Sequence, residues 1–147
     1  MIYLDTSFLI PYYLKESSSK AVELVLQAAP VGSLAVSTWT RVEFISTVAR
    51  KVRMKELTKG NATAHAQALE HDLQDGFQLL PCTTADFELS GQLLLLDPAL
   101  GLRGPDALHL ALARRHEAQI YSLDKTLIHA ATALGIPATD ANISGEA

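Results

Sequence analysis

The sequence predicts an α/β fold, in which a mostly parallel sheet of four to five strands carries helices on both of its faces. Short apolar runs alternate with longer segments of helical periodicity from one end of the chain to the other. The 147 residues, 48% of them hydrophobic, are enough for one buried core and too few for two. We therefore expect a single domain over residues 1–140 and a short C-terminal tail over residues 141–147.

The expected strands are short apolar runs, each bounded by a turn, cap or acidic residue. The first run, residues 2–4, ends at Asp5, which suits a buried strand that delivers a carboxylate to the edge of the sheet. Pro81 closes another run, because proline cannot continue the hydrogen bonding of a central strand. The strands are expected at residues 2–4, 34–36, 77–80 and 119–123, with a short edge strand at residues 136–139.

The expected helices carry apolar residues at spacings of three and four, as on the buried face of an amphipathic helix. Trp39, Val42 and Ile45 show this spacing clearly. Pro105 occupies a favoured first helical position, and Gly135 is placed to end the last helix. The helices are expected at residues 8–14, 20–29, 39–52, 62–73, 85–96, 106–116 and 125–134.

Composition restricts the class of protein. Charged residues make up 19% of the chain and the pI is near 5.7, so no overall positive field marks it as a nucleic-acid-binding protein. The single Cys82 excludes an internal disulfide bond and a thiolate zinc site. No secretion signal is visible, and no apolar stretch approaches the ~20 residues that span a bilayer. We expect a cytoplasmic protein without a membrane partner.

Three aspartates are placed to meet at one edge of the sheet. Asp5 ends one expected strand and Asp124 lies just past another, and ligands of such sheets bind at the carboxyl ends of the strands. Asp106 opens a helix. Each aspartate also has a structural explanation, because it could cap a helix or complement the dipole of a first helical turn.

Glu43 is the fourth candidate, and it is not at a helix end. It lies inside a helix, between Val42 and Phe44, on the border of the apolar face. A solvated glutamate would prefer the opposite face. The structural alternative is a half-exposed side chain that pairs with Arg41 or Arg50.

Carboxylates gathered at one sheet edge repel one another, so they remain ionised together when a cation lies among them. Oxygen ligands without histidine or cysteine favour Mg²⁺ or Mn²⁺ over zinc. Such a metal polarises a phosphoryl oxygen and lowers the pKa of a bound water, which makes phosphodiester hydrolysis the predicted chemistry.

The histidines offer no competing metal site. His65 and His71 are six residues apart, and His109 and His116 are seven apart, so neither pair has the spacing of a helical zinc site. We expect the histidines in core, surface or helix-packing roles. The sequence also lacks a phosphate-binding glycine loop and a serine-hydrolase elbow.

Four segments in this order resemble the PIN-domain ribonucleases, and particularly the VapC-type toxins of toxin–antitoxin pairs. They are residues 2–7, 39–44, 103–111 and 121–124, the last followed by residues 133–137. The resemblance implies a three-layer α/β/α sandwich and a metal-dependent endoribonuclease. Asp5 and Asp106 would be the principal metal ligands, Asp124 would bind a second metal or bind through water, and Glu43 would position a water or act as general base.

The resemblance also assigns supporting residues. Thr6 and Ser122 look like the hydroxyl residues that steady the neighbouring carboxylates. Family members commonly have threonine where Ser122 stands, and an additional acid that some of them carry near Asp124 is absent here. The number of metal ions therefore remains open.

The partners implied by the resemblance are RNA, most plausibly a tRNA or rRNA, a cognate small antitoxin and a second copy of the chain in a homodimer. An antitoxin arginine would suit an anionic pocket. Tyr12 and Tyr13 could stack on unpaired bases or pack in the core. The candidate RNA contacts are basic residues near the acids or at the end of the Glu43 helix: Arg50, Lys51, Arg53, Arg103 and Lys125.

Two other functions remain open. One is a catalytically inactive PIN-like module that binds a partner or RNA, against which the presence of all the acids argues. The other is a small metal-dependent phosphatase on a similar sheet, which would hydrolyse a phosphomonoester instead of RNA.

Overall fold

The sheet has five parallel strands in the order β3-β2-β1-β4-β5. The computed structural model describes residues 1–143, so residues 144–147 of the predicted tail lie outside the described residues. Strand β1 occupies the centre of the sheet, and its Leu4 is level with Tyr121 of β4. The strands are β1 (Ile2–Leu4), β2 (Leu34–Ser37), β3 (Gln78–Leu80), β4 (Gln119–Tyr121) and β5 (Ala138–Thr139).

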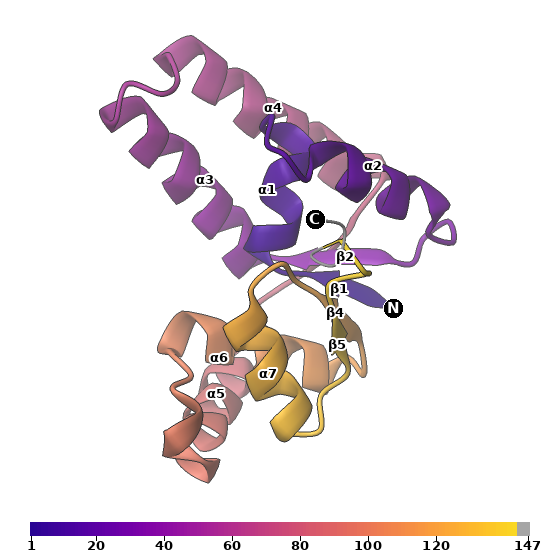
Figure 1. Cartoon of the computed structure of the whole chain (residues 1–147), viewed down its shortest axis with the longest axis vertical. Coiled ribbons are helices and arrows are strands. Elements are labelled where there is room, and N and C mark those ends of the chain that lie inside the picture. Colours follow the sequence, from indigo (N-terminus) through magenta and orange to yellow (C-terminus); the bar gives the residue numbers. More distant parts are fainter. Residues whose placement is uncertain (144–147) are drawn as a thin grey trace.

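Helices cover both faces of this sheet, with α1 to α4 on one side and α5 to α7 on the other (Figure 1). Successive strand residues point to opposite faces, so Tyr3 and Ile120 enter the core beneath α5 to α7, and Leu4 and Val36 enter the other. The predicted three-layer α/β/α architecture is confirmed. The helices are α1 (Thr6–Tyr13), α2 (Ser19–Ala28), α3 (Thr38–Arg53), α4 (Lys59–Asp75), α5 (Thr84–Leu96), α6 (Gly104–Arg115) and α7 (Lys125–Ala133), with a 3-10 turn, η1 (Pro98–Leu100).

Short polar side chains set where the helices begin. Asp5 accepts a hydrogen bond from the backbone N–H of Phe8, so α1 starts directly after the strand at Thr6, two residues before the predicted start. Ser37 and Thr40 form a capping box at the start of α3. Both capping residues, Asp5 and Ser37, lie where a strand ends. Their side chains are therefore at the carboxyl edge of the sheet.

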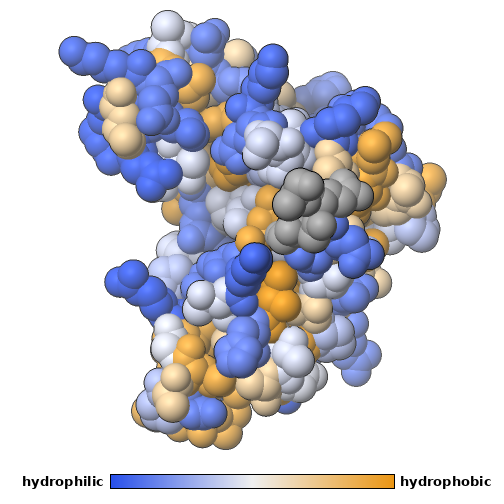
Figure 2. Space-filling model, viewed as in Figure 1, coloured by the Kyte–Doolittle hydropathy of each residue, from blue (hydrophilic) through white to orange (hydrophobic). Residues whose placement is uncertain are grey.

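The surface is mostly hydrophilic, and apolar side chains gather over α5 and the segment after it (Figure 2). Phe87, Leu95 and Leu96 of α5 are 57%, 80% and 66% exposed. Among the described residues, 1–143, no helix combines the length and the apolar character that a membrane crossing requires.

An ion pair between the buried Asp86 and the partly exposed Arg115 joins α5 to α6. Arg115 donates from Nη1 to Oδ1 of Asp86 at 2.5 Å, and the backbone N–H of Thr83 donates to Oδ2 at 2.7 Å. Burial raises the pKa of the fully buried Asp86, but these donors outweigh it and hold the pKa below its usual range. The pair therefore stabilises the fold when Asp86 is ionised.

We predict that Arg115→Met lowers the free energy of unfolding by about 2–4 kcal/mol, because it leaves a buried carboxylate without its cation. Urea denaturation measures the loss, with Arg114→Met as the control, since the contact that Arg114 makes among residues 1–143 is a long one to the Leu134 carbonyl at 3.4 Å. A lowered folded-state pKa gives stability that is complete above the ordinary carboxyl pKa of about 4 and disappears as pH falls below it. The parent and Arg115→Met should therefore converge in acid, and an equal gap at every pH would contradict the assignment.

Candidate active site

Asp5 is held rigidly at the carboxyl end of β1. Its side chain is 3% exposed and accepts hydrogen bonds from the Ser7 hydroxyl (2.7 Å), the Phe8 backbone N–H (3.0 Å) and the Ser122 hydroxyl (2.5 Å). Burial raises the pKa of Asp5, and the neighbouring His109 and the three donors offset this only in part, so the pKa remains above its usual value. The Asp5 side chain is thus fixed in place. The positive charge and the donors around it do not fully compensate the cost of burying its ionised form.

Ser122 connects Asp5 to Asp124. The Ser122 hydroxyl donates to Oδ2 of Asp5 and accepts from the backbone N–H of Asp124 at 3.0 Å. Asp124 in turn caps α7, with Oδ1 accepting from the backbone N–H groups of Thr126 and Leu127. The helix-cap explanations of Asp5 and Asp124 both hold, and the same geometry brings these two acids to one edge of the sheet.

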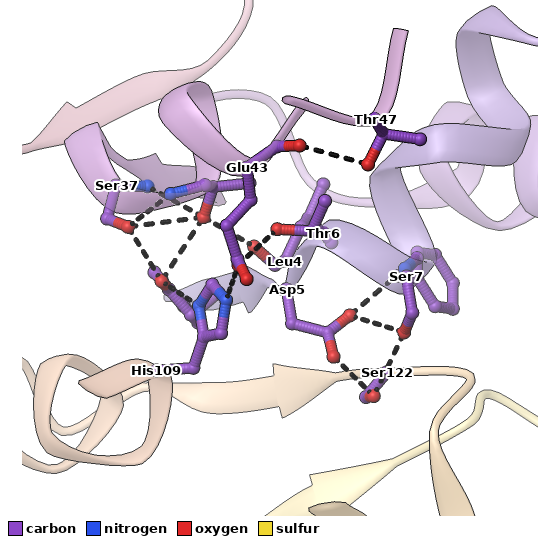
Figure 3. A network of polar contacts seen from close by, with 12 residues as sticks. Leu4, Asp5, Thr6, Ser7, Ser37, Glu43, Thr47, His109 and Ser122 are labelled. Carbon is purple, nitrogen blue, oxygen red and sulfur yellow. Dashed lines mark hydrogen bonds and ion pairs between the residues drawn. The ribbon is translucent and has the colours of Figure 1, made fainter. Parts of the chain in front are cut away.

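Glu43 reaches the same edge from the middle of α3. Its Oε1 accepts hydrogen bonds from the Thr6 hydroxyl at 2.7 Å and from Nε2 of His109 (Figure 3). Burial raises the pKa of Glu43, but His109 and Thr6 outweigh it, so the net pKa is lowered. The alternative ion pair with Arg41 is not formed, because Arg41 binds Glu70 with both a 2.5 Å and a 2.9 Å contact.

Asp106 lies in the first turn of α6 and is half-buried. Its pKa is raised first by burial and then by the negative charge of Asp124, with smaller contributions from Asp5 and Glu43. The other three acids therefore all oppose the ionisation of Asp106. The electrostatic coupling shows that the four predicted site residues share one region of the molecule.

The chemistry of this region fits a hard divalent cation, because Asp5, Asp106 and Asp124 offer carboxylate oxygens. The pKa of Asp106 is raised first by burial and then by the charge of Asp124, and a cation would offset that charge. Within residues 1–143, however, no three His, Cys, Asp or Glu side chains are grouped closely enough to form a metal site as they stand. Thr6 binds Glu43 and Ser122 binds Asp5, so both predicted hydroxyl residues contact an acid of the site.

His109 is the residue that sequence reasoning missed. It is 2% exposed, and its ring binds Glu43 through Nε2 and the Tyr3 hydroxyl through Nδ1 at 2.6 Å. The sequence left core, surface and helix-packing roles open for the histidines, and His109 is in the core, but the contact with a candidate site residue was overlooked. The available signal was that His109 lies three residues after Asp106, and positions three apart share one face of a helix.

The candidate RNA contacts separate into two groups. Arg103 and Lys125 are exposed, at the N-terminus of α6 and the first turn of α7, near Asp106 and Asp124. The others lie at the end of α3, about 10–15 Å along the helix from Glu43. They are Arg50, Arg53 and Lys51, which pairs with Glu56 at 3.3 Å.

The two tyrosines of α1 differ in their surroundings. Tyr13 donates to Asp72 at 2.6 Å and packs edge-on against Phe44, so it belongs to the core. Tyr12 is 38% exposed and meets Tyr13 edge-on.

A family model described as the PIN domain matches residues 2–133. The chain belongs to the PIN domain family. The predicted family is thus confirmed, and the match covers all four acids, Asp5, Glu43, Asp106 and Asp124. No curated protein matches the sequence.

Solved structures share the PIN fold at low sequence identity. FitAcB from Neisseria gonorrhoeae is 19% identical, with a TM-score of 0.71 over 96% of this chain and 98% of that one. VapC20 of Mycobacterium tuberculosis is 20% identical, with a TM-score of 0.72 over 92% and 96%. VapBC-1 from nontypeable Haemophilus influenzae is 20% identical, with a TM-score of 0.69 over 97% and 99%. The PIN fold of this chain therefore extends over nearly its whole length.

We predict that Asp106→Asn raises the melting temperature of the metal-free protein at neutral pH. A carboxyl whose folded-state pKa is raised destabilises the fold as pH climbs from its unfolded-state pKa, near 4, through the folded value. The gain should therefore shrink as pH falls towards 4 and also when a divalent cation is added to the parent. Differential scanning calorimetry measures both, with the exposed Glu88→Gln of α5 as the control. A lower melting temperature for Asp106→Asn at pH 7 would contradict the repulsion.

Proposed function

We propose that this protein is an endoribonuclease that hydrolyses RNA phosphodiester bonds with a divalent cation, Mg²⁺ or Mn²⁺. The observation that carries the proposal is the meeting of Asp5, Glu43, Asp106 and Asp124 at the carboxyl edge of a PIN-domain sheet, where Asp106 feels the charge of the other three. VapC20 of Mycobacterium tuberculosis, which shares the fold, is described as a sarcin-ricin loop cleaving toxin. That description supports structured RNA as the substrate class.

Each acid has a distinct task in this proposal. Asp5, fixed by its three donors, and Asp106 would hold the cation, and Asp124 would hold a second ion or bind through water. The bound cation supplies Lewis acidity to the phosphoryl group and favours loss of a proton from water. Glu43, which stays ionised because its pKa is lowered, orients the attacking water and accepts its proton. In-line attack then leaves a 5′-phosphate and a 3′-hydroxyl.

We further propose that the protein is the toxin of a toxin–antitoxin pair. A solved complex from Klebsiella pneumoniae, which shares the fold at 20% identity, is described as a toxin–antitoxin complex. A small antitoxin could place an arginine in the acidic pocket, because a guanidinium competes with a cation for carboxylates. The exposed Phe87, Leu95 and Leu96 of α5 support self-association into a homodimer.

The inactive PIN-like module remains the second candidate, because no three acids among residues 1–143 are drawn together as a metal site. The ribonuclease and the inactive module differ in whether the protein cleaves RNA. An inactive module binds RNA or a partner without cleaving RNA at any concentration of Mg²⁺ or Mn²⁺.

We predict that Asp5→Asn and Asp106→Asn each abolish RNA cleavage and leave the circular dichroism spectrum unchanged. Mutation of a residue that contacts a metal ligand typically costs roughly 10–100-fold in activity. The loss here should be larger, because each variant removes the charge of a ligand itself. The assay follows cleavage of a tRNA and rRNA panel with Mg²⁺ or Mn²⁺, with Glu88→Gln as the active control.

Two outcomes would overturn this assignment. Cleavage by Asp106→Asn at the parent rate would exclude the metal role of that residue. Turnover of a phosphomonoester in place of RNA by the parent would identify a phosphatase.

We predict that Arg103→Ala combined with Lys125→Ala raises KM for RNA and leaves kcat nearly unchanged. Each lost phosphate contact should reduce the slope of log affinity against log salt concentration by about 1. The comparison pair, Arg50→Ala with Arg53→Ala, lies at the far end of α3. This pair of substitutions should weaken the binding of long RNA and leave the binding of an oligoribonucleotide of a few nucleotides unchanged. Equal losses with the short substrate for both pairs would contradict this placement.

A further inference from the structure

A chain of hydrogen bonds runs through the core from β2 to Glu43. The Tyr3 hydroxyl is 2.8 Å from Oγ of Ser37 and 2.6 Å from Nδ1 of His109, and Nε2 of His109 binds Oε1 of Glu43 (Figure 3). Tyr3, Ser37 and His109 are at most 2% exposed, whereas the Glu43 side chain is 27% exposed. The chain therefore starts in the sheet and ends at the candidate active site.

The chemistry of the groups fixes the direction of the hydrogen bond to Glu43, and a neutral ring would set the directions of the others. A carboxylate only accepts, so Nε2 of His109 carries a proton and donates it to Glu43. Burial raises the pKa of Tyr3 far above its usual range, so its hydroxyl keeps its proton and can donate it to Nδ1 of a neutral ring. The Tyr3 oxygen accepts from the Ser37 hydroxyl, which itself accepts from the backbone N–H of Thr40 at 3.0 Å. The Tyr3 hydroxyl and both ring nitrogens of His109 thereby each have a hydrogen-bond partner.

This arrangement leaves one oxygen of Glu43 available. Thr6 and His109 both donate to Oε1, and among residues 1–143 no hydrogen bond is made to Oε2. A glutamate side chain has several rotatable bonds, and two donors on one oxygen remove most of that freedom. The anchored Oε1 therefore sets where Oε2 points.

A histidine needed only for packing would not require this environment. The α6 residues around His109, such as Ala107, Leu108 and Leu110, are buried and apolar, and an apolar side chain would avoid the cost of burying a ring with two polar nitrogens. Both nitrogens instead bind side chains from other elements, Tyr3 of β1 and Glu43 of α3. One of these partners is a candidate site residue.

We propose that His109 is a positioning residue, which holds Oε1 of Glu43 so that Oε2 faces the attacking water, and that Tyr3 keeps the ring in the tautomer this requires. The inference rests on the proposed ribonuclease function and adds two residues to it. His109 itself touches neither RNA nor the cation. It acts through Glu43.

A matched pair of substitutions separates the two ends of the ring. In His109→Gln the amide nitrogen takes a place close to Nε2 and can donate to Glu43, whereas in His109→Asn the amide reaches only the Nδ1 position beside Tyr3. We predict that His109→Asn lowers kcat for RNA by about 10–100-fold with little change in KM, as for the outer-shell partners of catalytic groups. His109→Gln should recover most of kcat, and Tyr3→Phe should cost less than His109→Asn.

A double-mutant cycle tests whether His109 acts through Glu43. In a Glu43→Gln background, His109→Asn should cause little further loss, because the group that it positions is already gone. Melting curves establish that the variants compared in the cycle have matched thermal stability. The ring is also observed directly by ¹⁵N NMR of the parent, which should show a protonated Nε2 without any substitution.

The outcomes distinguish this inference from the function on which it rests. Equal kcat in His109→Asn and His109→Gln, the same factor lost in both backgrounds, or an unprotonated Nε2 in the parent would each overturn the positioning role. A parent that cleaves no RNA would overturn the ribonuclease proposal, and the positioning role with it.

Discussion

The hydrogen bonds to Asp5 join the parts of the molecule on which the site depends. Asp5 ends the central strand, and its carboxylate is bound by the start of α1 and by Ser122, which follows β4. Ser122 also binds the backbone of Asp124, and Ser7 accepts from the backbone N–H of Leu123 at 2.9 Å. The carboxylate of Asp5 thus links the ends of β1 and β4 to the start of α1. It can do so because each donor is a backbone N–H or the hydroxyl of a serine, whose side chain is short.

Two carboxyl groups of the same site sit in opposite electrostatic environments. Glu43 has donors on Oε1 and a lowered pKa, whereas Asp106 has negative neighbours and a raised pKa. Such a separation suits a division of labour, in which one acid stays ionised to handle a proton and another requires a cation to ionise fully. Burial of Asp106, together with the repulsion, makes its ionisation costly to the stability of the fold. A functional site of this kind is therefore a place where the fold is less stable than its packing alone would allow.

Much of the fold could be predicted because its elements follow local rules. The short apolar run of β1 alternates between the two cores through Tyr3 and Leu4, and the cap at Asp124 begins α7 at the predicted residue, whereas the cap at Asp5 begins α1 two residues early. Element ends were less certain. The run from 119 to 123 was expected to be strand throughout, but β4 ends at Tyr121 because Ser122 turns towards Asp5 and Asp124.

By itself the sequence determined the α/β class and the helices on both faces of the sheet, and it named four acids as candidates, because periodicity, caps and strand ends are properties of neighbouring residues. Only the tertiary structure decided the partners of Glu43, since Arg41 is two residues away in sequence yet binds Glu70, and His109 is distant in sequence yet binds Glu43. The same holds for the charge that Asp106 experiences. Hydrogen bonds and charge interactions depend on distance in space, and packing of α3 and α6 against the central strand sets those distances.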